Sequence, residues 1–166
     1  MNILLVSDTH GNTDKLEKLL KIFSGELDLV CHMGDFGSDL LKYEKKYGNL
    51  KMAAVNGNTD YSLHGQTEQI IGISPSSEVK LRLLVTHGHK FGVKRNLDRL
   101  IKYAKELEVN AVFFGHTHED VCFVQDDIFV MNPGSLTFGK ERGNTYGLVR
   151  VTEDGKFSGE IINYEG

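Results

Sequence analysis

The sequence predicts an α/β protein with two mixed β-sheets packed face to face and helices on both outer faces. The first half of the chain alternates strand-like and helical segments, which is typical of parallel strands joined by right-handed crossovers. After residue 120 the helical period disappears, and apolar runs separated by turns indicate antiparallel strands. The length of 166 residues, with 40% hydrophobic and 25% charged residues, suits one soluble globular domain. We therefore expect a single domain, residues 1–166, built as a four-layer α/β/β/α sandwich.

The first half of the chain predicts three parallel strands with two helices between them. Each strand is a short apolar run, and the first helix has apolar residues at helical spacing. We expect Thr13 to cap the first helix and Gly25 to close it, and Ser38 to cap the second. The expected strands cover residues 3–6, 27–31 and 52–55, and the second helix covers residues 39–47.

The second half predicts one amphipathic helix among several strands. Apolar residues at helical spacing between Leu97 and Leu107 mark the helix. Pro133 and Gly134 mark a turn between two of the last strands. The expected strands cover residues 69–73, 79–85, 111–114, 121–124, 128–131, 146–151 and 157–164.

Composition excludes several classes of partner. A net charge of −4 gives no general attraction to nucleic acid or to an anionic membrane. No apolar run approaches the roughly 18 residues of a membrane span, and the first strand begins without the basic region of a signal peptide. Cys31 and Cys122 have no metal-motif spacing, so we expect buried free thiols and a cytoplasmic location.

Potential metal ligands follow five of the expected strands. The carboxyl ends of parallel strands are where sites form in open α/β sheets. Asp35 stands at one such end, and its carboxylate can offer one oxygen to each of two ions about 3.5–4 Å apart. A mixture of carboxylate, imidazole and amide oxygen suits Mn²⁺, Fe, Zn²⁺ or Ni²⁺. The candidates are Asp8, His10, Asp35, Asn58, His87, His116 and His118. For His32, His64 and His89 we expect structural or supporting roles.

The motifs containing these residues resemble the metallophosphoesterase (calcineurin-like) superfamily. They are Asp8-x-His10, Gly34-Asp35, Gly57-Asn58-x-Asp60, His87-Gly88 and Gly115-His116-Thr117-His118. Within the superfamily, the short length and the stretches Thr86-His87-Gly88-His89 and Asn132-Pro133-Gly134-Ser135 resemble the small YfcE-type phosphodiesterases. The resemblance implies two divalent ions, most simply Mn²⁺, with a bridging hydroxide that attacks phosphorus. It places one ion on Asp8, His10, Asp35 and His118, and the other on Asp35, Asn58, His87 and His116. Among these ligands, Asp35, Asn58 and His116 are expected to take part in catalysis.

One position departs from the pattern of many superfamily members. A histidine that is thought to protonate the leaving group often follows the metal-binding asparagine, but here that position is Thr59. Asp60 could orient the Asn58 loop or form a simple turn. His89 could support the site. Arg142 could meet a distal substrate group or remain a solvated surface charge.

Three functions are compatible with the sequence. The favoured one is a dinuclear phosphodiesterase acting on a small diester. A phosphomonoesterase or pyrophosphatase could use the same ligands. A non-catalytic scaffold like the retromer subunit, which resembles this family in fold, has lost part of the ligand set. Every ligand position is filled here, which favours an enzyme whose partner is a small phosphate ester. We expect no stable nucleic acid partner, no membrane, and a possible homodimer.

Overall fold

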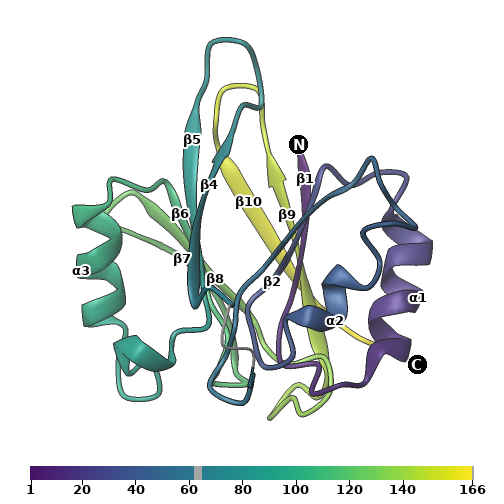
Figure 1. The fold of residues 1–166 in the computed structure, drawn as a ribbon. Helices are drawn as coiled ribbons and strands as arrows, with labels where there is room; N and C mark the ends of the chain where they lie inside the picture. Colours follow the sequence, from purple (N-terminus) through teal and green to yellow (C-terminus); the bar gives the residue numbers. More distant parts are fainter. Residues whose placement is uncertain (62–64, 166) are drawn as a thin grey trace.

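The computed structural model describes residues 1–61 and 65–165 and contains two five-stranded sheets packed face to face (Figure 1). The first sheet has the strand order β10 (Phe157–Asn163), β9 (Thr145–Val151), β1 (Asn2–Val6), β2 (Leu29–His32) and β3 (Lys51–Ala54). The second has the order β4 (Glu68–Ile73), β5 (Leu81–Thr86), β6 (Ala111–Phe113), β8 (Ile128–Pro133) and β7 (Asp120–Gln125).

Helices cover the outer faces of both sheets. Helices α1 (Thr13–Phe23) and α2 (Ser38–Leu41) lie on the side of the first sheet, and α3 (Asp98–Glu106) lies on the side of the second (Figure 1). A short 3₁₀ turn, η1 (His89–Phe91), follows β5. None of the described helices has both the length and the apolar composition needed to cross a bilayer. The predicted four-layer α/β/β/α arrangement is confirmed.

The side chains of strand β1 explain why its sheet is covered on both faces, by the second sheet on one side and by α1 on the other. Side chains alternate between the two faces of a strand. Ile3 and Leu5 belong to the core between the sheets, whereas Leu4 and Val6 pack in the core shared with α1. Both faces of β1 are therefore covered, which explains its uninterrupted apolar run.

Three predicted helix boundaries were wrong. Thr13 and Ser38 are the first residues of α1 and α2 and not their caps; Asn12 and Gly37 occupy the cap positions, in neither case with a side-chain hydrogen bond. Helix α2 ends at Leu41, and the predicted continuation to residue 47 consists of turns. Along these turns only Tyr43 and Tyr47 pack against the neighbouring core, so little burial supports a longer helix.

The cysteines were predicted correctly as free but not both as buried. Cys31 is buried on the central strand β2. Cys122 is exposed on β7, contrary to the prediction, because β7 is the outermost strand of its sheet.

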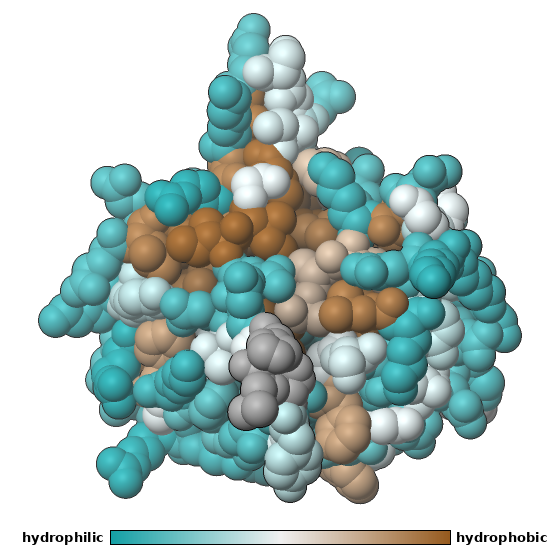
Figure 2. All heavy atoms as spheres, in the orientation of Figure 1, coloured by the Kyte–Doolittle hydropathy of each residue, from teal (hydrophilic) through white to brown (hydrophobic). Residues whose placement is uncertain are grey.

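The parallel strands bring their carboxyl ends to one edge of the molecule. β1 pairs in parallel with β2, β2 with β3, and β5 with β6. The loops that follow them lie at the lower edge in Figure 1. Figure 2 shows a mostly hydrophilic surface at that edge, whereas apolar residues gather higher up, over β4 and β5. The candidate ligands of the sequence analysis all lie in these loops.

Candidate metal centre

The backbone is unusual at most of the candidate ligands. Five of the seven adopt a left-handed conformation, which costs a residue other than glycine about 1–2 kcal/mol. The φ angles are 55° at Asp8, 49° at His10, 51° at Asp35, 72° at His116 and 58° at His118. Such residues persist only where the surroundings hold them in place, and they concentrate at functional sites. These tight loops turn side chains from separate strands toward one space.

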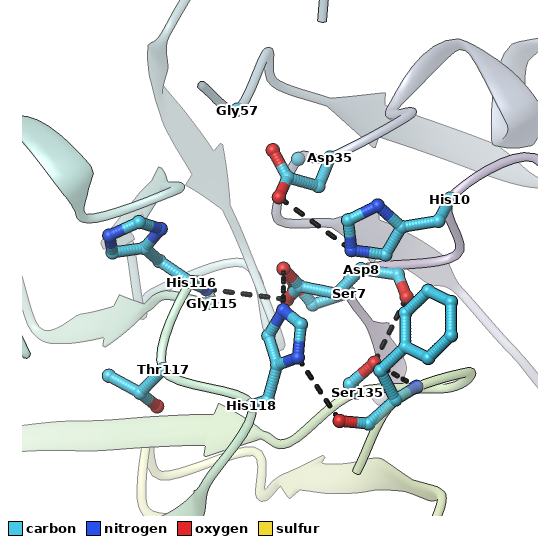
Figure 3. A network of polar contacts seen from close by, with 12 residues as sticks. Ser7, Asp8, His10, Asp35, Gly57, Gly115, His116, Thr117, His118 and Ser135 are labelled. Atoms are coloured by element: carbon cyan, nitrogen blue, oxygen red, sulfur yellow. Dashed lines mark hydrogen bonds and ion pairs between the residues drawn. The ribbon is translucent and has the colours of Figure 1, made fainter. Parts of the chain in front are cut away.

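Four candidate ligands form a first cluster, which we call cluster 1: Asp8, His10, Asp35 and His118. One ligand atom from each lies within 4.8 Å of all the others (Figure 3). Asp8 Oδ1 lies 3.1 Å from His118 Nε2, and His10 Nε2 lies 3.7 Å from Asp35 Oδ2. Asp8 Oδ1 and His10 Nε2 are buried, and neither has a hydrogen-bond partner among the described residues. Buried polar atoms are normally satisfied, so these two fit a site for a cation.

A second group, cluster 2, shares Asp35 and adds Asn58, His87 and His116. His87 Nε2 is its centre. It lies 3.4 Å from Asp35 Oδ1, 3.1 Å from Asn58 Oδ1 and 3.2 Å from His116 Nδ1. Asp35 therefore directs Oδ2 toward cluster 1 and Oδ1 toward cluster 2. This division of its two oxygens is the arrangement that a bridging carboxylate requires.

Backbone carbonyls determine which ring nitrogen of two histidines faces the site. His87 Nδ1 lies 2.6 Å from the Met33 carbonyl oxygen, and His118 Nδ1 lies 3.1 Å from that of Phe138. A carbonyl only accepts hydrogen bonds, so Nδ1 carries the proton in both rings. Each neutral ring then presents the lone pair of Nε2 to its cluster, as a metal-ligating histidine does.

The electrostatic environment keeps Asp8 and His116 in forms that bind cations. Burial raises the pKa of Asp8, but the contact with His118, the neighbouring His87 and the Ser7 hydroxyl bring it below its ordinary value. The same contact with Asp8 raises the pKa of His118. Burial and the neighbouring His87 lower the pKa of His116 to about 4. Asp8 is thus an anion and His116 a neutral imidazole near neutral pH.

Thr59 and Asp60 support the ligands through the backbone. The Thr59 N–H donates to Asp35 Oδ1 at 3.0 Å, while its hydroxyl is buried with no partner in the described chain. Asp60 accepts the N–H groups of Phe36 at 2.9 Å and Gly57 at 2.6 Å. It joins the loop after β2 to the Asn58 loop, so the orienting role considered for Asp60 agrees with these contacts.

His89 lies beside cluster 2. Its ring centroid is 5.4 Å from that of His87 and 6.1 Å from that of His116. Its Nδ1 is buried and lacks a hydrogen-bond partner within the described ranges. A supporting or substrate-facing position for His89 is compatible with this placement.

The structure does not bring every candidate to the centre. Arg142 forms an ion pair with Asp120 at 2.9 Å, and Lys140 pairs with Glu119 at 2.6 Å. These pairs agree with the surface-charge alternative for Arg142. His64 lies outside the described residues.

Sequence reasoning missed the residues that support two loops of the centre, residues 115–118 after β6 and the loop that carries Asp8 after β1. We expected a turn at residues 132–135 and assigned these residues no contact with the centre. In the structure, Asn132 Nδ2 donates to the Gly115 carbonyl at 3.1 Å and to Thr117 Oγ1 at 2.9 Å. Ser135 Oγ donates to the Asp8 carbonyl at 3.0 Å. The sequence did contain a compact Asn-Pro-Gly-Ser motif at these positions. Its hydrogen-bond partners lie far away in the sequence, so the motif alone could not reveal them.

Comparisons of sequence and fold relate this chain to known phosphoesterases. A model of the calcineurin-like phosphoesterase superfamily domain matches residues 1–154. The chain is 32% identical over 156 residues to the probable metallophosphoesterase YsnB of Bacillus subtilis, covering 93% of this chain and 86% of YsnB. It is 31% identical over 169 residues to the phosphodiesterase YfcE of Escherichia coli K12, covering 90% and 87%. A solved structure of a predicted phosphoesterase from Streptococcus pneumoniae has a TM-score of 0.73 at 24% identity, covering 97% and 96%. At that identity the likeness is one of fold.

Proposed function

Because the chain belongs to the calcineurin-like phosphoesterase superfamily, we propose that it is a dinuclear metal-dependent phosphodiesterase that hydrolyses a small phosphate diester. The observation that carries the proposal is Asp35. Its two oxygens face two separate groups of ligand atoms, one around Asp8 and one around His87. The relatives named phosphodiesterase support the diester class.

The donor set fits two divalent ions. Cluster 1 would hold one ion, and cluster 2 would hold the other. Carboxylate, imidazole and amide oxygen donors suit Mn²⁺ first, with Ni²⁺, Zn²⁺ and Fe as alternatives. When bound, such ions polarise phosphoryl oxygens and lower the pKa of water toward ~7.

The protein residues contribute orientation and charge. In the neutral rings of His87 and His118, the Met33 and Phe138 carbonyls hold the proton on Nδ1 and direct the lone pair of Nε2 at the clusters. The Thr59 N–H holds Asp35 Oδ1 toward cluster 2. In hydrolysis, a water oxygen adds to phosphorus and the ester oxygen leaves with a proton. Thr59 Oγ1 can donate a hydrogen bond but is too weak an acid to protonate that oxygen near neutral pH.

The test is a substrate panel measured with metal-free and metal-loaded protein. We expect turnover of bis(p-nitrophenyl) phosphate that Mn²⁺ or Ni²⁺ stimulates and a chelator abolishes. Faster turnover of p-nitrophenyl phosphate or pyrophosphate would favour the monoesterase or pyrophosphatase alternative. Mn²⁺-loaded protein that hydrolyses no phosphate ester, yet binds another protein tightly, would support the scaffold alternative and contradict the proposal.

A further inference from the structure

A buried polar network, separate from clusters 1 and 2, contacts the loop that carries the cluster 1 ligands Asp8 and His10 and contains none of the ligands itself. It consists of Thr9, His32 and Asp39, whose exposed fractions are 0%, 0% and 1%. Thr9 Oγ1 lies 2.8 Å from Asp39 Oδ2 and 3.0 Å from His32 Nε2. Burying polar groups this deeply costs folding free energy unless their hydrogen bonds are complete. The partner of each group in the network therefore has to be identified.

The direction of these hydrogen bonds follows from the chemistry of the groups. The Gly34 N–H donates to His32 Nδ1 at 3.2 Å, so the ring proton is on Nε2. Nε2–H donates to Thr9 Oγ1, whose own hydrogen is donated to Asp39 Oδ2. Burial lowers the pKa of His32 to about 4, in agreement with a neutral ring. The chain of donors therefore ends at a carboxylate on α2.

Asp39 holds the β1–α1 loop at two points. Besides the Thr9 hydroxyl, Oδ2 accepts the Gly11 N–H at 3.1 Å, and these two residues flank His10. Oδ1 pairs with Lys42 Nζ at 2.7 Å, so the buried carboxylate is not left uncompensated. The loop needs such an anchor because Asp8 and His10 both adopt left-handed backbone conformations.

We propose that Asp39, acting through Thr9 and with His32 completing the network, is the positioning residue that sets Asp8 and His10 for the ion of cluster 1. The inference rests on the proposed function, since it assumes that cluster 1 binds a metal. Within the described chain, the hydrogen bonds of the network reach the β1–α1 loop, Gly34 and, at 3.5 Å, the Phe36 carbonyl, and none of them reaches Asn58 or His87. Its effect should therefore be selective for one of the two ions. Asp60 provides the contrast, because it accepts the Gly57 N–H beside Asn58 of cluster 2, together with the Phe36 N–H beside the shared Asp35.

The test measures equilibrium binding of Mn²⁺ alone to the metal-free full chain. Wild type is expected to bind two ions. The reference variants His118→Ala and His87→Ala identify which binding step belongs to which cluster. Asp39→Ala should weaken the cluster 1 step by about 10–100-fold, the usual effect of losing a group that orients a ligand, and leave the cluster 2 step within about 3-fold. Asp60→Ala should weaken the cluster 2 step more than the cluster 1 step, because Asp60 contacts Gly57 beside Asn58 as well as Phe36 beside the shared Asp35.

Conservative variants separate positioning from general stabilisation. Asp39→Asn keeps an oxygen that can accept both hydrogen bonds, so it should restore most of the affinity. Thr9→Val removes only the hydroxyl and should resemble Asp39→Ala, whereas Thr9→Ser should resemble wild type. Asp98→Ala, an exposed aspartate in the first turn of α3, is the matched control and should bind both ions normally.

The outcomes distinguish this inference from the function on which it rests. A lowered melting temperature with two unchanged Mn²⁺ affinities in Asp39→Ala and Thr9→Val would overturn the positioning role and leave the proposed function intact. An equal loss of affinity for both Mn²⁺ ions in these variants would also overturn the positioning role. If Asp39→Ala does not fold, the comparison of Thr9→Val with Thr9→Ser decides. Wild type that binds no Mn²⁺ would overturn the proposed function and this inference together.

Discussion

Replacing Gly57 with alanine would create a steric clash with Asp35, whose carboxylate we propose as the bridge between the two ions. Gly57 lies beside Asp35 in the structure (Figure 3). A Cβ at position 57 would lie 2.1 Å from Asp35 Oδ1 and 2.4 Å from Asp35 N. Ordinary van der Waals contact begins at 3.4 Å. One of the two loops must therefore move by about 1 Å, because close-packed surroundings leave no room to absorb the overlap.

The overlap involves a backbone atom, so rotation of the Asp35 side chain cannot relieve it. Gly57 is not among the glycines with positive φ, and its backbone would otherwise accept alanine. The hydrogen bond from Gly57 N to Asp60 also resists displacement of the loop. A misplacement of about 1 Å at a reacting centre typically costs about 100-fold in rate. We expect Gly57→Ala to lower kcat on bis(p-nitrophenyl) phosphate by about that factor.

The assay compares Gly57→Ala with Gly25→Ala at saturating Mn²⁺, with a thermal melt of each variant. Nothing lies within 4 Å of a Cβ at Gly25, which is exposed near the end of α1. Gly25→Ala should keep wild-type activity, and both variants should be folded at the assay temperature. Wild-type kcat and Mn²⁺ binding in Gly57→Ala would refute the reasoning, because the close packing of the two loops would then not be needed for the site.

Three further predictions follow from the site. Asp35→Asn should weaken binding of both ions and His10→Ala chiefly one, as counted by metal analysis after dialysis; a single ion in wild type would contradict the bridge. Cleavage should depend steeply on leaving-group pKa, because Thr59 stands where many superfamily members have the histidine that is thought to protonate the leaving group. Thr59→Ala should cost little with an aryl diester; kcat/KM across a leaving-group series measures both expectations, and a flat dependence in wild type would reveal an unrecognised acid. Arg142→Ala should change kcat/KM for a small diester less than about 3-fold, since an exposed ion pair contributes roughly 0–1 kcal/mol; a loss of tenfold or more would assign it a substrate contact.

Much of the layered fold follows from patterns within single segments. The apolar run of β1 indicated a strand covered on both faces, and the alternation of Ile3 and Leu4 between two cores is what such a run requires. The second helix was predicted less well. Its length depended on how much apolar surface residues 42–49 could bury, and that is settled by packing against distant segments.

The sequence by itself determined which residues could form the centre, because carboxylates, imidazoles and an asparagine follow the strands whose carboxyl ends must meet at one edge. Only the tertiary structure decided how they are held. The two directions of the Asp35 carboxylate, the carbonyls facing His87 and His118, and the buried Asp39 network all join segments far apart in the chain. Local patterns carry no information on such contacts, since a side chain's partner across a packed interior depends on the position of the whole loop and not on its neighbours in sequence.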